Sequence, residues 1–295
     1  MTDIYEQVTE FIINQLKQIQ ETGVHERWLT PWKDSNAGVY PINIYTNAPY
    51  TGINVLLCWM ASFKHGFTYN KWMTFRQMLQ YGADNNMELS VKGEKGTKLI
   101  RVIDWKPKDA KPDDPFLKRQ KQFTVFNASQ IAGLTGYKDE STSPKTPITY
   151  ECAHAFVKAT QAVIKDHPNE AFYERVNDFI GRPPLDSFNS EELYIATEFH
   201  ELGHWTGHKS RLDRDLEGGR NSKEYAYEEL VAELNSAFFA QHFGLDGKLQ
   251  HAEYLNHYIN ILKSDHNIIK KASADAQKAY EYLHNLQPTA LDIAV

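Results

Sequence analysis

The chain has 295 residues, 41% of them hydrophobic and 24% charged, a composition typical of folded globular proteins, and this length predicts two domains. No apolar run approaches the roughly 18 residues that cross a bilayer, and the acidic start lacks the basic and apolar parts of a signal peptide, so we expect a cytoplasmic protein without membrane contact. The two cysteines, Cys58 and Cys152, lie far apart and outside a CxxC spacing, which argues against a disulfide framework or a cysteine zinc site.

Charge is divided unevenly between the two halves. Residues 1–140 carry 17 Lys and Arg against 15 Asp and Glu, whereas residues 141–295 carry 15 against 23. The basic excess is concentrated in residues 64–121, with 13 basic and 7 acidic side chains. This segment is suited to a polyanion, and the acidic half is not.

Three helices are expected in the first half, at residues 3–22, 53–65 and 71–82. The first has apolar residues at helical spacing and ends at Gly23, and the last ends at Gly82. Residues 28–52 are rich in Pro, Gly and Asn and predict loop with short extended pieces.

Short β-prone segments follow at residues 88–91, 97–104 and 123–127, and the Pro- and charge-rich stretch 106–122 predicts a long mobile loop between strands. The Ser/Thr/Pro-rich stretch 139–149 predicts a linker. We therefore expect an α+β protein, with a first domain at 1–138 containing a small antiparallel sheet.

The second domain, residues 150–295, is expected to be mostly helical. Apolar periodicity predicts helices at about 150–165, 190–208, 222–243, 249–264 and 267–286.

The strongest motif of the chain is His200-Glu201-Leu202-Gly203-His204. Residues 191–205 contain no proline, and Ser190 is a suitable N-cap, so the motif should lie on a helix. His200 and His204 then share one helix face and can hold one metal ion, while Glu201 can act as the general base on a water molecule.

An acidic helix after the motif resembles the one in thermolysin-like zincins, or gluzincins. In those proteins the third metal ligand is a glutamate on such a helix, and a carboxylate four residues later orients a ligand histidine. The match implies Glu229 as third ligand and Glu233 as its partner, with zinc as the metal. Glu228 points about 100° away on the helix and is expected to be solvated.

Some roles stay open. His208 lies one turn beyond His204 and is an alternative metal ligand. His208, Tyr225 and Tyr227 are candidates for a side chain that stabilises a developing oxyanion. A metal that only holds the fold is a further alternative to a catalytic one.

Five of the six tryptophans lie in the first 105 residues, where aromatic and basic side chains together suit a single strand of nucleic acid. Trp59, in an apolar run, is expected in the core. The candidates for DNA contact are Trp32, Tyr50, Asn54, Trp72, Lys92, Lys95, Lys98 and Arg101.

Both halves resemble the ArdC antirestriction proteins of conjugative plasmids. The resemblance rests on HELGHWTGHKSRLDR and YAYEELVAELNSAF in the second half, and on Trp28 to Trp32, NAPYTGIN (47–54), KGEKG (92–96) and Val125-Phe126-Asn127 in the first. It implies an N-terminal single-stranded-DNA-binding domain, also found in TraC primases of conjugative plasmids, and a C-terminal zincin-like metallopeptidase domain.

The function implied is protection of incoming plasmid DNA from host restriction, with binding that shows no strong sequence preference. One alternative is a non-catalytic protein that coats single-stranded DNA or binds the restriction enzyme, with a structural metal. Another alternative is a nuclease. The zincin arrangement argues against it, because it offers one metal site and no carboxylate cluster for a second metal ion. Besides single-stranded DNA, a restriction-system protein or a peptide substrate is expected as a partner.

Overall fold

We describe the protein from a computed structural model. It describes residues 3–22, 40–67, 69–109, 111, 113–134, 150–216, 218–219, 222–245 and 255–288. The expected linker 139–149 and the DNA-contact candidate Trp32 lie outside the described residues.

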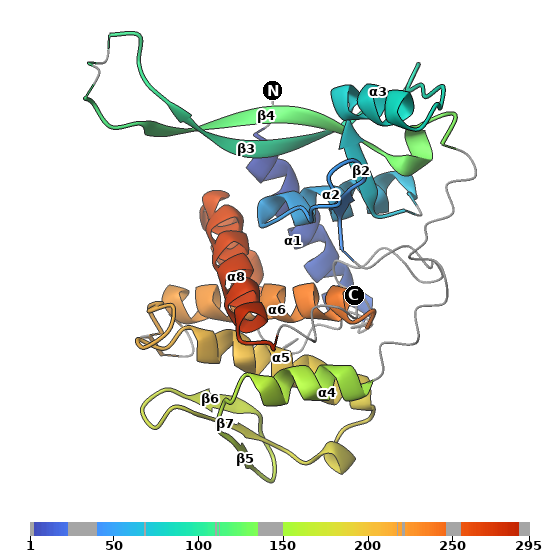
Figure 1. Cartoon of the computed structure of the whole chain (residues 1–295). Coiled ribbons are helices and arrows are strands. Elements are labelled where there is room, and N and C mark those ends of the chain that lie inside the picture. Colours follow the sequence, from blue (N-terminus) through green and yellow to red (C-terminus); the bar gives the residue numbers. More distant parts are fainter. Residues whose placement is uncertain are drawn as a thin grey trace.

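A four-stranded sheet with strand order β1-β2-β4-β3 forms the frame of the N-terminal half (Figure 1). The strands are β1 (Ile42–Asn43), β2 (Lys71–Thr74), β3 (Thr97–Trp105) and β4 (Leu117–Asn127). The expected small antiparallel sheet is formed by β2, β4 and β3, and the short strand β1 adds a parallel pair at the β2 edge.

Helices α1 (Ile4–Thr22) and α2 (Ile53–His65) confirm two of the expected helices, and α2 ends at Gly66, whose φ of 66° suits glycine. The expected helix at 71–82 was wrong in its first four residues, which form β2. Helix α3 (Phe75–Asp84) begins only after Thr74, whose side chain caps it in a reciprocal capping box with Gln77. A short 3₁₀ turn, η1 (Ala128–Gln130), follows β4.

The C-terminal half contains the expected helices; four of them are shorter than expected, and the start of the expected helix 249–264 lies outside the described residues. They are α4 (Tyr150–Ala159), α5 (Glu191–Thr206), α6 (Lys223–His242), α7 (Leu255–Ser264) and α8 (Asn267–Asn285). A three-stranded sheet that was not predicted from the sequence precedes α5, with strand order β5-β7-β6. Its strands are β5 (Ile164–Asp166), β6 (Phe172–Glu174) and β7 (Phe179–Arg182). The 3₁₀ turn η3 (Leu185–Ser187) follows the sheet. Strands of three or four residues are too short to show a period. None of the helices described is both long and apolar enough to cross a membrane.

The largest hydrophobic core is shared by both halves. It joins buried residues of α1, α2 and β3 to those of α6, α7 and α8, for example Trp59 of α2 with Phe238 of α6. Gln277 of α8 adds a polar link, since its Oε1 accepts hydrogen bonds from the Gly52 amide (3.0 Å) and the Tyr40 hydroxyl (3.1 Å). The N-terminal half therefore shares a core with α6, the helix that carries Glu229.

Candidate metal centre

Helix α5 presents the HELGH residues on a buried face. It begins at Ser190, whose Oγ accepts a hydrogen bond from the Leu193 amide at 3.1 Å. His200 and His204 follow at i and i+4, so their side chains are neighbours on one face, with ring centroids 4.9 Å apart and the ring planes nearly perpendicular at 78°. His200 and Glu201 are almost completely buried, and His204 is partly exposed.

Glu229 comes from α6, which packs closely along α5. The two helix backbones approach at Gly203, where a Cβ atom would lie 3.0 Å from the Ala232 Cα. Asn235 holds the same contact by donating from Nδ2 to the Phe199 carbonyl at 2.8 Å. This spacing allows a glutamate side chain to reach across to both histidines.

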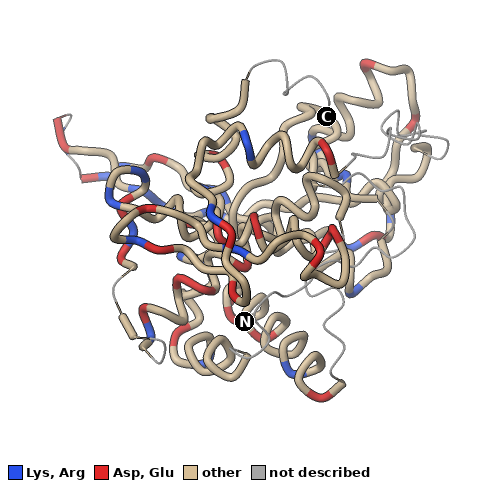
Figure 2. Tube along the Cα trace, turned by 90° about the horizontal axis from the view of Figure 1, so that it is seen from below, with Lys and Arg blue, Asp and Glu red and all other residues tan. Residues whose placement is uncertain are grey.

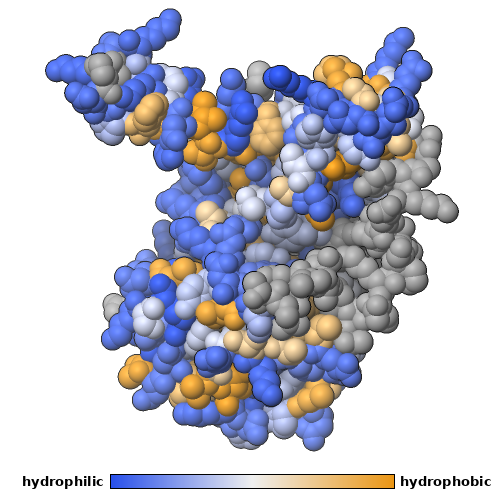
Figure 3. Space-filling model, in the orientation of Figure 1, coloured by the Kyte–Doolittle hydropathy of each residue, from blue (hydrophilic) through white to orange (hydrophobic). Residues whose placement is uncertain are grey.

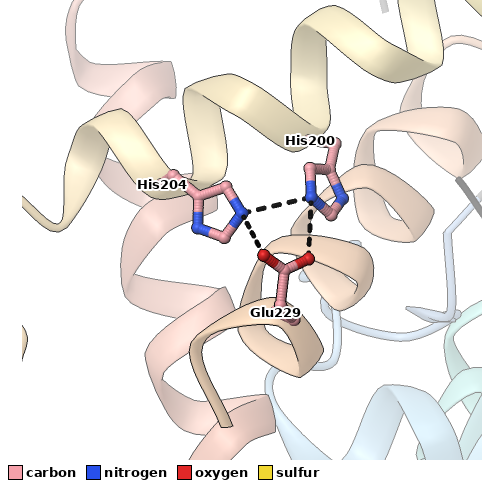
Figure 4. Close-up of side chains that lie close together, drawn as sticks. All are labelled: His200, His204 and Glu229. Atoms are coloured by element: carbon pink, nitrogen blue, oxygen red, sulfur yellow. Dashed lines mark hydrogen bonds and ion pairs between the residues drawn. The ribbon is translucent and has the colours of Figure 1, made fainter. Parts of the chain in front are cut away.

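Figure 4 shows the resulting cluster of His200, His204 and Glu229. The two histidine Nε2 atoms lie 3.1 Å apart, and each lies 3.5 Å from one Glu229 carboxylate oxygen. Ligand atoms at about 2.0–2.1 Å from a tetrahedral ion are themselves about 3.3 Å apart. The three donors thus fit a single divalent cation. Among the described residues, His200, His204 and Glu229 are the cluster of His, Cys, Asp or Glu side chains that could hold a metal ion.

A second layer of carboxylates lies behind the histidines. Glu233 Oε1 is 3.6 Å from His200 Nδ1, and its role in orienting this ring stays a prediction. Glu228 Oε1 is 3.2 Å from His204 Nδ1, and Arg214 Nε and Nη2 donate to the two Glu228 oxygens at 2.9 and 2.6 Å.

The expectation that Glu228 is solvated was wrong, since its exposure is only 5%. Glu228 is enclosed between His204 of α5 and Arg214 of the segment that follows α5. Arg214 of this segment also donates to the Gly203 carbonyl (2.7 Å) and the Thr206 hydroxyl (2.9 Å). Arg214 was not predicted as a site residue from the sequence. The indication available there was the position of this arginine in the short segment between the HELGH motif and the acidic helix.

The electrostatics of the cluster favour positive charge. Burial by itself would raise the pKa of Glu229, but the neighbouring His204 and His200 outweigh it and hold that pKa well below its usual range. Burial would lower the pKa of His204, yet Glu229 and Glu228 raise it well above its usual value. A cation bound at the cluster would replace this proton.

The cluster forms one wall of a pocket of about 410 Å³. Glu201 lines it together with both histidines and Glu229, and β6 and the turns beside it also contribute to the lining. The other lining residues are Glu170, Ala171, Phe172, Tyr173, Arg175, Leu216, Glu224, Tyr225 and Glu228.

The pocket separates the three oxyanion candidates. Tyr225 lines it, whereas the Tyr227 hydroxyl donates to Asp275 of α8 at 2.7 Å. His208, the alternative metal ligand, lies outside the pocket lining, with its Nδ1 2.7 Å from the Ser210 hydroxyl.

The DNA-contact candidates fall into two groups. Trp72 is completely buried and Tyr50 is 9% exposed, so neither presents a ring to a base. The Asn54 side chain is used within the fold. It accepts a hydrogen bond from the Ile100 amide and donates one to the Ile100 carbonyl, both at 2.8 Å. The remaining four described candidates, Lys92, Lys95, Lys98 and Arg101, are exposed. Trp59 lies in the core, as expected, at 1% exposure.

A helix carrying HExxH, a facing glutamate helix and a small sheet beside the cleft define a zincin-like metalloprotein. The sequence model of a zincin-like metallopeptidase matches residues 151–275, and that of the N-terminal domain of anti-restriction factor ArdC matches residues 2–132. The chain belongs to the ArdC antirestriction family.

Solved structures and sequence relatives agree with this assignment. The Mn(II)-bound crystal structure of antirestriction protein ArdC from plasmid R388 has a TM-score of 0.74 and 32% identity, covering 97% of this chain and 98% of that one. Its metal-free form also gives a TM-score of 0.74, at 33% identity and the same coverage.

Among sequence relatives, protein y4eC of Sinorhizobium fredii is 30% identical over 98% of this chain and 94% of its own length. DNA primase TraC of Escherichia coli is 36% identical over 95% of this chain. The chain spans only about a quarter (27%) of that primase.

Proposed function

We propose that this protein protects incoming plasmid DNA from host restriction by combining single-stranded-DNA binding with a zinc-dependent, peptidase-type site. The observation that carries the site is the triangle of His200, His204 and Glu229 on the wall of a pocket that also contains Glu201. Two histidines and one glutamate are the ligand set of catalytic zinc sites, which keep a fourth position for water.

A zinc ion held by these donors would lower the pKa of a water molecule and polarise a peptide carbonyl. With a metal bound, Glu201 would be the general base that takes a proton from water and returns it to the leaving amine. Tyr225, the oxyanion candidate that lines the pocket, would donate a hydrogen bond to the carbonyl oxygen. Glu228 and Glu233 hold the two histidine rings in position.

The pocket suits an extended peptide. Strand β6 is an edge strand of its sheet, and its residues Phe172 and Tyr173 line the same pocket as the metal-ligand candidates. An edge strand can pair with a peptide through backbone hydrogen bonds. Apolar and aromatic side chains of the pocket then contact the substrate side chains.

The charge of the pocket argues against the nuclease alternative. Its lining contains five glutamates, at positions 170, 201, 224, 228 and 229, against the single arginine Arg175. Even with one divalent cation bound, such a lining repels phosphodiesters. Incubation of labelled single strands with metal-loaded protein should therefore yield no cleavage products.

Single-stranded-DNA binding is supported by the membership of the ArdC family and by the basic excess of residues 64–121. Binding that is mainly to phosphates should be tolerant of sequence and sensitive to salt. The other candidate function is a DNA-coating or restriction-enzyme-binding protein with a structural metal, which the acidic C-terminal half would suit as a protein-binding surface.

The deciding experiment is Glu201→Gln in a restriction-protection assay, with metal content measured on the same preparation. This variant keeps the side-chain shape and the three metal ligands but removes the base. Loss of protection with full metal content and unchanged DNA binding supports peptide hydrolysis. Full protection by Glu201→Gln would establish the coating or binding mechanism instead. Glu151→Gln, an exposed carboxylate of α4 outside the pocket, is the matched control.

A further inference from the structure

The β3–β4 hairpin continues beyond the sheet as a projecting arm. Figures 1 and 3 show it standing away from the rest of the molecule, with mostly hydrophilic side chains and a few apolar ones. Lys and Arg positions gather along it at the left of Figure 2. We call residues 101–105 and 117–121 the arm.

The strand register sorts the arm's side chains onto two faces. In an antiparallel pair, directly opposite residues lie on the same side. Arg101 is opposite Lys121, Ile103 is opposite Arg119, and Trp105 is opposite Leu117. These six residues, here called the cationic face, therefore lie on one side of the arm.

The opposite face is different in charge. It contains Val102 opposite Gln120, and Asp104 opposite Lys118, with the Asp104 carboxylate 2.6 Å from the Lys118 ammonium. Lys98 also belongs to this side, and its Nζ donates to the Thr124 hydroxyl at 2.7 Å. Cations on this face are thus balanced or engaged.

The cationic face has three positive charges and no carboxylate among its six residues. Arg101 and Lys121 are direct neighbours, and Arg119 is diagonal to Arg101, within reach of its long side chain. Like charges placed opposite one another destabilise a strand pair. This arrangement gives nothing to the stability of the hairpin, but an anionic chain laid along it would remove the repulsion.

An aromatic and apolar surface adjoins these charges. The Trp105 side chain is 36% exposed, with the Arg119 guanidinium 5.3 Å from its ring centre, and Leu117 is 49% exposed. Aromatic rings beside cations are how proteins hold unpaired bases and phosphates together. In a duplex the base faces are already stacked and cannot use this surface.

We propose that the cationic face of the arm is the surface that binds single-stranded DNA, with Arg101, Arg119 and Lys121 on phosphates and Trp105 stacked on a base. The inference rests on the proposed single-stranded-DNA binding and replaces the buried candidates Trp72 and Tyr50. The root of the arm is held rigid, since Asn54 fixes both backbone groups of Ile100, next to Arg101.

The test uses the full chain and a fluorescein-labelled oligothymidylate, with binding followed by anisotropy across a salt series. Each phosphate contact to a single strand contributes a salt slope of about 0.7, or about 5-fold in affinity at about 0.1 M salt. Arg101→Gln/Arg119→Gln/Lys121→Gln should thus weaken binding about 100-fold and lower the slope by about 2. Trp105→Ala should weaken it by about 5- to 150-fold.

The matched control is Lys158→Gln/Lys263→Gln/Lys271→Gln, which removes the same charge from exposed positions of the C-terminal half. It should bind as the unmodified protein does. Equal losses in the two triple variants would overturn the proposal, because net charge alone would then explain the effect. Unchanged circular dichroism and metal content show that the arm variants remain folded.

Two further outcomes distinguish failure of the proposed DNA-binding function from failure of its location on the arm. If the unmodified protein binds no oligothymidylate, the proposed DNA-binding function itself fails. If it binds and the arm triple variant binds equally well, only the location on the arm is wrong. Preference of the unmodified protein for duplex over single strands, lost in the arm variant, would overturn the assignment of an unpaired strand.

Discussion

Gly203 of α5 lies directly against Ala232 of α6, at a distance where a Cβ atom would meet the Ala232 Cα at 3.0 Å. The glycine of the HELGH motif thus sets the separation of the two helices that supply the metal ligands. The same Cβ would lie 3.3 Å from Asn235 Nδ2, so neither neighbour is a freely movable group.

Gly203→Ala should push α6 away and weaken the site. Overpacking of this kind costs about 1–3 kcal/mol, of which the higher helix propensity of alanine returns up to about 1 kcal/mol. Metal affinity should also fall, because Glu229 moves with α6; urea unfolding and a chelator competition measure the two effects. Gly219→Ala, with no atom within 4 Å of the added Cβ, is the control. Equal affinities in the two variants would contradict the prediction.

Replacing the two adjacent glutamates should separate a ligand from a positioning residue. Glu229→Ala removes a donor and should abolish stable metal binding, whereas Glu228→Ala should reduce affinity about 10- to 100-fold, because His204 loses its partner. Glu228→Ala should also destabilise the protein by about 3–5 kcal/mol, since it leaves the buried Arg214 charge unpaired. Metal analysis and denaturant unfolding give both readouts. Identical metal content in the two variants would refute the ligand assignment.

Asp178 should make stability depend on pH in the acid range. Its hydrogen bonds with Arg211 hold the pKa of this carboxyl below its usual value, with Nη1 2.9 Å from Oδ2. A lowered pKa in the folded state means that the stabilisation is complete above the unfolded pKa of about 3.9 and is lost as pH falls through the folded one.

Asp178→Asn should therefore destabilise the protein near neutral pH, and the difference from the unmodified chain should shrink as pH falls below about 4. The effect should be no more than about 1 kcal/mol, because the carboxylate is partly solvated. Thermal unfolding across pH measures it. Asp113→Asn, on the exposed hairpin loop, should change little at any pH, and a constant difference for Asp178→Asn would contradict the linkage.

Asn54→Ala should loosen the root of the arm rather than remove a DNA contact. The variant leaves the amide and carbonyl of Ile100 without their side-chain partners, at about 1–3 kcal/mol for each buried group. Hydrogen exchange at the Ile100 amide should speed up, and the free energy of unfolding should fall. An unchanged exchange rate together with lost DNA binding would instead make Asn54 a direct contact.

Local patterns accounted for much of the molecule. Apolar spacing and caps placed α1, α2 and α5 within a few residues, because a helix repeats its burial every 3.6 residues and its ends need specific side chains. The i, i+4 spacing of His200 and His204 likewise predicted that both lie on one face of the helix. These features depend only on residues close in sequence.

Other features depended on what packs against each element. Lys71–Thr74 is a strand because β4 pairs with it, and Trp72 is buried by that pairing although its sequence gave no sign of this. Glu228 is buried because it is enclosed between His204 of α5 and Arg214 of the segment that follows α5. The contact between Gly203 and Ala232 likewise depends on packing between helices. The sequence by itself determined that HELGH forms a helix with two histidines on one face. Only the tertiary structure decided how near α6 lies and which glutamates reach the two histidines, because these distances depend on residues far apart in the chain.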